Sequence, residues 1–476
     1  MLRTFALAAV LAPSGALASD AIPGEVTRFT SPNGVEERCI RLPRMPGATY
    51  SKKDMEAEAE YCAIDFYAPT VALCPKTWST SPGMMVYDIS EGNYAGDREG
   101  FERHACAEGN AAKGLAKKDL AKFKPTMNAK GTSGTFSASP LMYYHFSRYF
   151  EADIAVPPAV WRSMDRQMHL SEVARPGLAI SGHSHSSGMN YAGWKMLVDS
   201  DANPDLYKPK AELFTSDGAA LYGALLDSPG ARYGSEVNGT RASGWGKGQN
   251  YDFQVTAPFL ALRSGAPVEK AIAEGIAGAM KDKQLKRDTG ADVDPRQVAF
   301  WMSDIANIVL LDFIFSQQDR IGNIDYTVHW MWVEDGKVKS HKADTHSKDR
   351  GKAPETAIRV KRTHLNDNDA GGKVSYANFT KSTQMLEKLR HFPAVTFQKL
   401  VAMDADFRAQ GPLFAYARDS FGLDGKQLAQ VVRNTALAVS ILGETCRKGE
   451  MRFDLDAEAF FLHGKVPSAE VTCPAE

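Results

Sequence analysis

The stretch W-M-S-D-I-A-N-I-V-L-L-D-F-I-F-S-Q-Q-D-R-I-G-N-I-D, residues 301–325, changes abruptly from an apolar pattern to a polar loop. Its apolar residues recur at helical spacing. Asp294 followed by Pro295 predicts the start of this helix, because the aspartate can cap the first turn and proline needs no hydrogen bond there. We expect a buried helix that ends in a loop carrying Asp319, Asn323 and Asp325.

A β-hairpin is predicted directly after this loop. Residues 326–333 are aromatic and β-branched, Glu334-Asp335-Gly336 is a turn signal, and residues 337–343 can form the returning strand. The hairpin ends at Asp344. It is therefore expected to carry a third carboxylate back toward the loop.

These acids have the order that phosphoryl transfer needs. One carboxylate, Asp319, would orient and deprotonate an acceptor hydroxyl. Asn323 or Asp325, together with Asp344, would bind Mg²⁺ or Mn²⁺, because these ions prefer oxygen ligands.

The loop resembles the catalytic loop of the protein-kinase-like superfamily, particularly that of the secretory-pathway Golgi casein kinase family. Phosphatidylinositol kinases and HipA-type kinases are more distant relatives. The resemblance implies that Asp319-Arg320 matches the catalytic Asp-Arg pair, with Arg320 on the cofactor side. Two departures are visible: Asn323 follows Asp319 by four positions rather than five, and Thr345-His346 follows Asp344 where Phe-Gly is usual.

A second group of motifs supports the same resemblance. Phe123-Lys124-Pro125, Tyr144-His-Phe-Ser-Arg148 and Val156-Pro-Pro158 occur in the order in which the Golgi casein kinase family has its lysine strand, helix and exit step. The resemblance implies that Lys124 contacts the phosphates of ATP. These kinases hold the lysine with a glutamate, yet no acidic residue lies between Asp119 and Glu151. A carboxylate from elsewhere, a differently oriented lysine and a pseudokinase all stay open.

The N-terminus and the cysteines indicate export. Residues 1–18 have a basic start, an apolar centre and an Ala16-Leu17-Ala18 ending, which predicts a signal peptide cleaved after Ala18 and a secreted or periplasmic protein. Six cysteines then suggest disulfides. The simplest pairing joins Cys446 to Cys473 and leaves the first four to pair among themselves, in any of three connectivities.

Composition sets limits on the function. The chain has 476 residues, 43% of them hydrophobic, and a net charge of −1, which gives no electrostatic footprint for nucleic acid. No apolar run long enough to cross a membrane is expected in the mature chain. The expected divisions are the signal peptide 1–18, a cysteine-containing extension 19–110, an N-terminal lobe 111–263, a helical C-terminal lobe 264–446 and a tail 447–476.

Three further segments have weaker signals. Residues 181–188, with His183 and His185, could be a metal site, a phosphate-covering loop or a surface loop; residues 235–250 are a glycine-rich loop. Residues 251–262 are expected to form a strand and hinge between the lobes. Residues 347–372, with a basic trio at 359, 361 and 362, could be a substrate loop or a solvated one.

The sequence thus predicts a two-lobed α+β protein-kinase-like fold with a disulfide-braced N-terminal extension. The expected function is ATP-dependent phosphoryl transfer to a hydroxyl of a protein, sugar or lipid headgroup, with Mg²⁺ or Mn²⁺. The alternatives are a nucleotide-binding pseudokinase, a non-catalytic envelope structural or binding domain, and a metal hydrolase that uses His183 and His185. The oligomeric state is not determined by the sequence.

Overall fold

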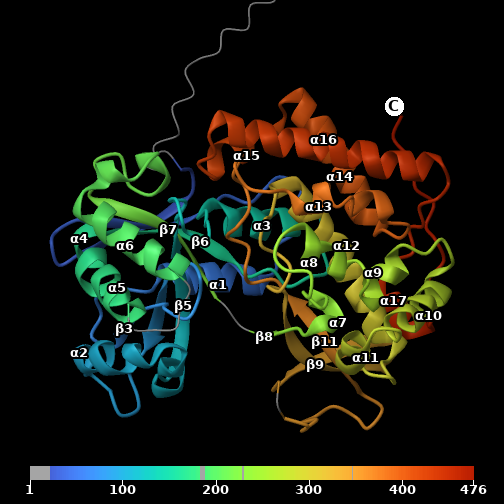
Figure 1. Cartoon of the computed structure of the whole chain (residues 1–476), viewed down its shortest axis with the longest axis horizontal. Coiled ribbons are helices and arrows are strands. Elements are labelled where there is room, and N and C mark those ends of the chain that lie inside the picture. Colours follow the sequence, from blue (N-terminus) through green and yellow to red (C-terminus); the bar gives the residue numbers. More distant parts are fainter. Residues whose placement is uncertain (1–21, 183–187, 228–229, 346, 476) are drawn as a thin grey trace, which may run out of the picture.

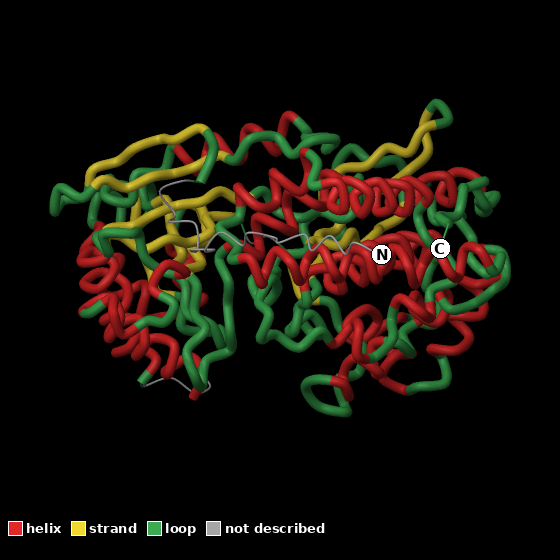
Figure 2. The backbone as a smooth tube through the Cα atoms, turned by 90° about the horizontal axis from the view of Figure 1, so that it is seen from above, coloured by secondary structure: helices red, strands yellow, loops and turns green. Residues whose placement is uncertain are grey.

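The computed structural model describes residues 22–182, 188–227, 230–345 and 347–475. The predicted signal peptide and the histidines at 183 and 185 lie outside the described residues. Two lobes lie side by side, one rich in strands and one rich in helices (Figure 1). Figure 2 shows the same division from above. The predicted two-lobed α+β class is confirmed.

The N-terminal lobe is built on a seven-stranded sheet of order β1-β2-β6-β7-β5-β4-β3, all of whose neighbours are antiparallel. The strands are β1 (Glu25–Thr30), β2 (Glu36–Arg41), β3 (Val71–Pro75), β4 (Met84–Asp88), β5 (Lys118–Pro125), β6 (Ala159–Asp165) and β7 (Ala220–Leu226). The helices are α1 (Lys52–Cys62), α2 (Arg98–Gly100), α3 (Ala138–Tyr149), α4 (Arg166–Met168), α5 (Arg175–Ser181) and α6 (Gly188–Ala202). The segment 19–110, predicted as an extension, therefore also completes this sheet with four of its strands.

The C-terminal lobe combines helices with a small sheet of order β10-β9-β11, to which β8 is added. The strands are β8 (Ala231–Arg232), β9 (Asp325–Glu334), β10 (Lys337–Ala343) and β11 (Ile358–His364). The helices are α7 (Ser235–Asn238), α8 (Lys247–Phe253), α9 (Ala257–Leu262), α10 (Val268–Ala279), α11 (Lys283–Thr289), α12 (Pro295–Phe315), α13 (Phe379–Ser382), α14 (Ala394–Ala409), α15 (Pro412–Ser420), α16 (Gly425–Arg447) and α17 (Ala457–His463).

The helix α12 is the centre of the hydrophobic core. Asp294 caps its first turn as predicted, accepting a hydrogen bond from the backbone N–H of Arg296 at 2.8 Å. The helix packs against α9, α16 and α17 and also contacts α3 of the other lobe. Ser316 ends it in the left-handed conformation (φ 54°), and the chain turns from there into the polar loop.

Two expectations about this lobe are wrong. The segment 251–262 is not a strand with a hinge, because it forms the end of α8 and all of α9. Among the described residues, α12 does have the length and hydropathy of a membrane span, with a mean hydropathy of 1.7, although no such run was expected. All of that window is buried inside the protein, as in the core helix of a globular fold.

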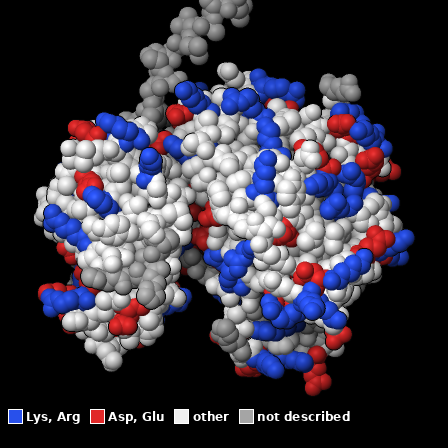
Figure 3. All heavy atoms as spheres, in the orientation of Figure 1, with Lys and Arg blue, Asp and Glu red and all other residues white. Residues whose placement is uncertain are grey.

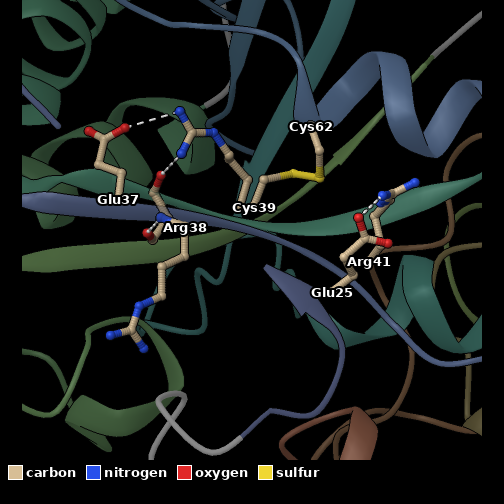
Figure 4. The surroundings of a disulfide bond; sticks show 8 residues. Glu25, Glu37, Arg38, Cys39, Arg41 and Cys62 are labelled. Atoms are coloured by element: carbon tan, nitrogen blue, oxygen red, sulfur yellow. Dashed lines mark hydrogen bonds and ion pairs between the residues drawn. A yellow bond between two sulfur atoms is a disulfide. The ribbon is translucent and has the colours of Figure 1, made fainter. Parts of the chain in front are cut away.

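Three disulfides brace the chain: Cys39–Cys62, Cys74–Cys106 and Cys446–Cys473. The predicted C-terminal pairing is confirmed, and the first four cysteines pair among themselves. Figure 4 shows the first disulfide joining β2 to α1, with Glu37 on the same strand. Glu37 forms an ion pair with Arg162 of β6 at 3.1 Å, in which both side chains are fully buried. Disulfides of this kind persist in oxidising compartments.

The disulfides Cys39–Cys62 and Cys446–Cys473 form a matched pair for a stability measurement, because they span 23 and 27 residues. Chain entropy alone gives each about 3 kcal/mol. We expect the double alanine variant at 39 and 62 to lose more in the free energy of unfolding, because Cys39 is fully buried in the sheet and its removal leaves a cavity. Urea unfolding of both variants measures this difference. Equal losses would show that packing at Cys39 contributes nothing.

Candidate active site

A cavity of about 500 Å³ lies between the two lobes. In the space-filling view, the hollow between the lobes contains acidic side chains at its depth (Figure 3). Its lining includes polar residues from both lobes: Lys76, Ser79, Thr80, Ser81, Lys122, Arg232, Asp319, Asn323, Asp325, Asp367 and Asp369. A cavity of this volume is within the range of small-molecule sites.

The strand β5 supplies two lysines from the N-terminal lobe. Lys122 and Lys124 are two positions apart and therefore point to the same side of the sheet. Both are only 2% exposed. Lys124 Nζ lies 2.5 Å from Asp369 Oδ2 and donates to Ser81 Oγ at 2.8 Å, while Lys122 Nζ lies 3.9 Å from Asp367 Oδ1. A carboxylate from outside α3 thus holds the predicted lysine.

The connection between β3 and β4 covers this lysine pair. It runs K-T-W-S-T-S-P-G from Lys76 to Gly83, and five of its residues line the cavity. A hairpin with a short serine- and glycine-containing turn, followed by the lysine strand, is the arrangement that covers nucleotide phosphates in kinases. A Cβ on Gly83 would lie 3.1 Å from the carbonyl oxygen of Phe123, so glycine allows the turn to approach β5 closely.

The lysines of the cleft are buried close together, and this lowers the pKa of two of them. Burial, with Lys124 and Lys122 nearby, lowers the pKa of Lys76 to about 7. Burial also lowers the pKa of Lys122 from its ordinary value. Burial alone would raise the pKa of Asp367, but the neighbouring lysines and Arg232 hold it well below its ordinary value. The N-terminal wall of the cleft is therefore short of negative charge.

The loop after α12 supplies the facing acids. Asp319 lines the cavity, and burial together with the nearby acids Asp369 and Asp367 raises its pKa. The indole N–H of Trp245, which is 65% exposed, donates to Asp319 Oδ1 at 3.4 Å. Asn323 Nδ2 donates to the carbonyl oxygen of Asp319 at 2.8 Å, which fixes the turn of the loop.

A buried asparagine of α7 holds the loop from behind. Asn238 Oδ1 accepts hydrogen bonds from the N–H groups of Gly322 and Ile324, at 2.9 and 3.3 Å. Its Nδ2 donates to the carbonyl oxygens of Tyr233 and Ile324, at 3.0 and 3.1 Å. The glycine-rich segment 235–250 thus contains, at the end of α7, the residue that supports the loop, and it contributes Trp245 at the rim.

The predicted metal acid Asp344 does not lie in this cleft. It is exposed beyond the end of β10, where its carboxylate accepts a hydrogen bond from the N–H of Ser347 at 2.9 Å. The strand β11 returns on the other side of β9, and the segment after it places Asp367 and Asp369 in the cavity. The structure therefore corrects the position of the third acid, because the returning strand is β11 and not the second strand of the hairpin.

Arg320 also lies outside the cleft. It is 4% exposed, and its guanidinium donates to both oxygens of Asp312, to the carbonyl oxygen of Asp367 at 3.0 Å and to Asn368 Oδ1 at 2.9 Å. Tyr143 of α3 donates to the same Asp312 at 2.5 Å. Arg320 therefore joins α12 to the acidic segment and does not face a cofactor.

The basic trio of the predicted substrate loop is also engaged elsewhere. All three residues lie on β11. Lys361 pairs with Glu236 at 2.6 Å, Arg362 pairs with Asp153 at 2.8 Å, and Arg359 donates to backbone carbonyl oxygens after β10. These contacts hold β11 in place and pair each of the three side chains with acids or backbone oxygens of the chain.

Three side chains of the cleft have oxygen atoms that could bind a divalent metal. Asn323, Asp325 and Asp367 offer the oxygen atoms that Mg²⁺ and Mn²⁺ prefer. Within the described residues, however, no three carboxylates, histidines or cysteines are grouped so that they could hold an ion. The guanidinium of Arg232 contacts all three of these donors instead. The cleft as built does not fit a two-ion centre.

The sequence pattern does not identify six of these cleft residues as functional: Lys76, Ser81, Lys122, Arg232, Asp367 and Asp369. Two signals were available. Lys122 precedes Lys124 by two positions, and Asp367-Asn-Asp369-Ala-Gly-Gly has an acid before a glycine pair. The others depend on contacts between distant segments.

Comparisons with known proteins found a distant likeness to two solved structures. No protein-family model and no curated protein matches the chain. It is similar to a crystal structure of the Golgi casein kinase with Mn/ADP bound, at 11% identity and a TM-score of 0.42, covering 83% of this chain and 77% of that one. A second Golgi casein kinase structure matches at 12% identity and a TM-score of 0.43, with the same coverage.

The buried pair of Arg320 and Asp312 can be compared with Arg296 and Asp294 at the exposed start of the same helix, where the ion pair measures 2.6 Å. Replacing Arg320 by methionine leaves a buried carboxylate without its cation, so we expect a loss of about 3–5 kcal/mol in the free energy of unfolding. Replacing Arg296 by methionine should cost less than about 1 kcal/mol. Denaturant unfolding measures both. Similar losses would contradict the supporting role assigned to Arg320.

Proposed function

We propose that the protein transfers the γ-phosphoryl group of ATP to a hydroxyl acceptor. The observation that carries the proposal is one cleft that is lined by Lys76 and by the buried Lys122 of β5 as well as by Asp319 of the loop after α12. Phosphoryl transfer requires positive charge around the phosphates and an oxygen base near the acceptor. The positive charge lies on one wall of the cavity and the oxygen base lies on the opposite wall.

The cleft also has room for the nucleotide base. Trp78, Met85 and Tyr87 line the cavity on the side of β4. An aromatic and aliphatic wall stacks against a planar base, and the adjacent turn from Ser79 to Ser81 then places backbone and hydroxyl groups beside the phosphates. Lys122 and Lys124 lie below that turn.

The transfer step follows from the positions of these groups. The acceptor oxygen forms a bond to the γ-phosphorus, the bond from that phosphorus to the β–γ bridging oxygen breaks, and ADP leaves. The proton of the acceptor hydroxyl passes to Asp319, whose raised pKa suits a proton acceptor. Lys76, Lys122 and Lys124 neutralise the phosphates. A divalent ion, Mg²⁺ or Mn²⁺, stays a prediction.

A nucleotide-binding pseudokinase is the second candidate. The specific observation in its favour is the short ion pair of Lys124 with Asp369, which holds the lysine away from a ligand. In active kinases the equivalent lysine is held by a glutamate of the following helix and still contacts the nucleotide. This candidate predicts nucleotide binding without transfer.

The acceptor base can be tested by replacing Asp319 with asparagine. We expect ATP to raise the melting temperature of the variant as it does that of the wild type, because Asp319 does not contact the nucleotide. The rate of phosphoryl transfer should fall by about 10²–10⁴. Transfer of labelled phosphate from ATP to a panel of serine peptides, sugars and inositol headgroups measures the rate.

The exposed acid Asp344, replaced by asparagine, is the matched control and should change neither quantity. A wild-type transfer rate in the Asp319 variant would contradict the assigned role. Binding of ATP by the wild type with no transfer to any acceptor would favour the pseudokinase.

The lowered pKa of Lys76 predicts that ATP binding takes up protons. In the free protein the lysine is largely neutral above its pKa of about 7. Bound phosphates favour the charged form and raise that pKa. Between pH 7 and the ordinary lysine pKa of 10.5, binding should therefore take up a proton, and affinity should fall as pH rises.

Calorimetry of ATP binding at pH 8 in two buffers with different ionisation heats counts these protons. The Lys76→Gln variant is the control and should lose most of the uptake. The same proton count in wild type and variant would show that Lys76 does not face the phosphates.

A further inference from the structure

Arg232 is surrounded by oxygen atoms of the loop after α12 and of the segment after β11. Its Nε donates to Asp325, and its two terminal nitrogens donate to the carbonyl oxygen of Gly322, to Asn323 Oδ1 and to Asp367 Oδ2, the last at 3.1 Å. An amide oxygen, a carbonyl oxygen and two carboxylates around one positive charge form the kind of donor set that otherwise surrounds a divalent ion.

The backbone of Arg232 is fixed on both sides. The two residues of β8 pair with the start of β9, with Arg232 opposite Asp325. The next residue, Tyr233, donates its N–H to the carbonyl oxygen of Ile324 at 3.1 Å and is 2% exposed. Its hydroxyl accepts a hydrogen bond from the indole of Trp301 on α12 at 3.2 Å. The guanidinium is therefore attached to a rigid part of the core.

The guanidinium is well suited to bind these oxygen atoms, although the Arg232 side chain is 42% exposed. Its N–H groups have a fixed planar arrangement, and it keeps its charge at any pH at which the protein is folded. Asn366 adds a further bond to Asp325 Oδ2 at 3.0 Å, so that Asp325 is held on both oxygens. A mobile ion would have to displace several charge-assisted hydrogen bonds to reach the same donors.

We propose that Arg232 is a built-in cation that takes the position of one divalent ion, so that ADP and ATP bind largely without metal. The proposal rests on the function proposed above and specifies how its cleft neutralises phosphate. Arg232 supplies one positive charge on the C-terminal wall. The carboxylate of Asp367 lies between it and Lys122 of the facing wall, at 3.1 Å and 3.9 Å, and the phosphates would lie beside this carboxylate, within reach of both cations.

Calorimetry of the disulfide-bonded protein with ADP in EDTA, with ADP and MnCl₂, and with MnCl₂ alone tests the proposal. The wild type should bind ADP in EDTA with an affinity within a few-fold of that in Mn²⁺. Arg232→Met should weaken ADP binding in EDTA by about 10–100-fold, because a hydrogen-bonded charge is lost. It should also bind Mn²⁺ alone at least about tenfold more tightly, because Asn323, Asp325 and Asp367 are released.

Two further variants distinguish an effect of the positive charge on ADP binding from an effect on folding. Arg232→Lys keeps the charge without the planar fork, so it should retain part of the ADP affinity in EDTA. Arg359→Met removes an exposed arginine of β11 outside the cleft and should behave as the wild type. Melting temperatures of all variants without ligand show whether each is folded.

The outcomes are distinct. If the wild type binds ADP only with Mn²⁺, and Arg232→Met gains no affinity for Mn²⁺, the built-in cation is overturned while the nucleotide site stands. If the wild type binds no ADP under any condition, the proposed function is overturned. In that case the measurement with MnCl₂ alone still tests whether Arg232 takes the position of a metal ion. An unchanged Mn²⁺ affinity in Arg232→Met overturns that role of Arg232 as well.

Discussion

The buried ion pair between Asp312 and Arg320 is the interaction on which the rest of the cleft depends. It lies where the apolar helix α12 ends, 2–4% exposed, and it joins that helix to the loop. Arg320 reaches onward to the segment after β11, and Tyr143 brings α3 to the same carboxylate. A buried pair is stabilising only when its remaining hydrogen bonds are satisfied, and here those partners come from two further parts of the chain, α3 and the segment after β11. The pair therefore fixes geometry that apolar packing alone would leave loose.

The start of α3 shows how the fold accommodates a missing acid. The helix has no carboxylate near the lysines, and Ser139 instead donates to the carbonyl oxygen of Asn368. That bond helps to hold the segment from which Asp369 pairs with Lys124 and Asp367 lies near Lys122. The neutralising charge has moved from a helix of one lobe to a strand end of the other. A carboxylate from elsewhere, Asp369, thus pairs with the lysine, and the pseudokinase alternative is not decided by that contact.

The parts of this site that sequence could predict are those set by local pattern. The cap at Asp294, the apolar periodicity of α12 and the hairpin of β9 and β10 all follow from neighbouring residues, and each is present in the structure. The position of Asp367 depends on β11 pairing with the free edge of β9, across a segment whose composition is only polar. Arg232 depends on a strand of two residues, too short to have any periodicity. The sequence favours Asp344 as the third acid because the hairpin of β9 and β10 is visible in the sequence pattern. The third strand, β11, is not visible there.

The pairing of Lys124 with Asp369 has a consequence for regulation. In a kinase whose lysine is anchored within its own lobe, the two lobes can separate without disturbing that anchor. Here the anchor belongs to the segment after β11, which is bonded to the N-terminal lobe through Phe136 and Ser139, so the position of that segment sets the orientation of the lysine. A partner protein or a ligand that pulls the lobes apart would release the ammonium group, and one that clamps them together would sequester it. If the cleft binds phosphate as proposed, binding at a remote surface would change phosphate affinity with no contact to the nucleotide, provided that it favours one interlobe distance over the other.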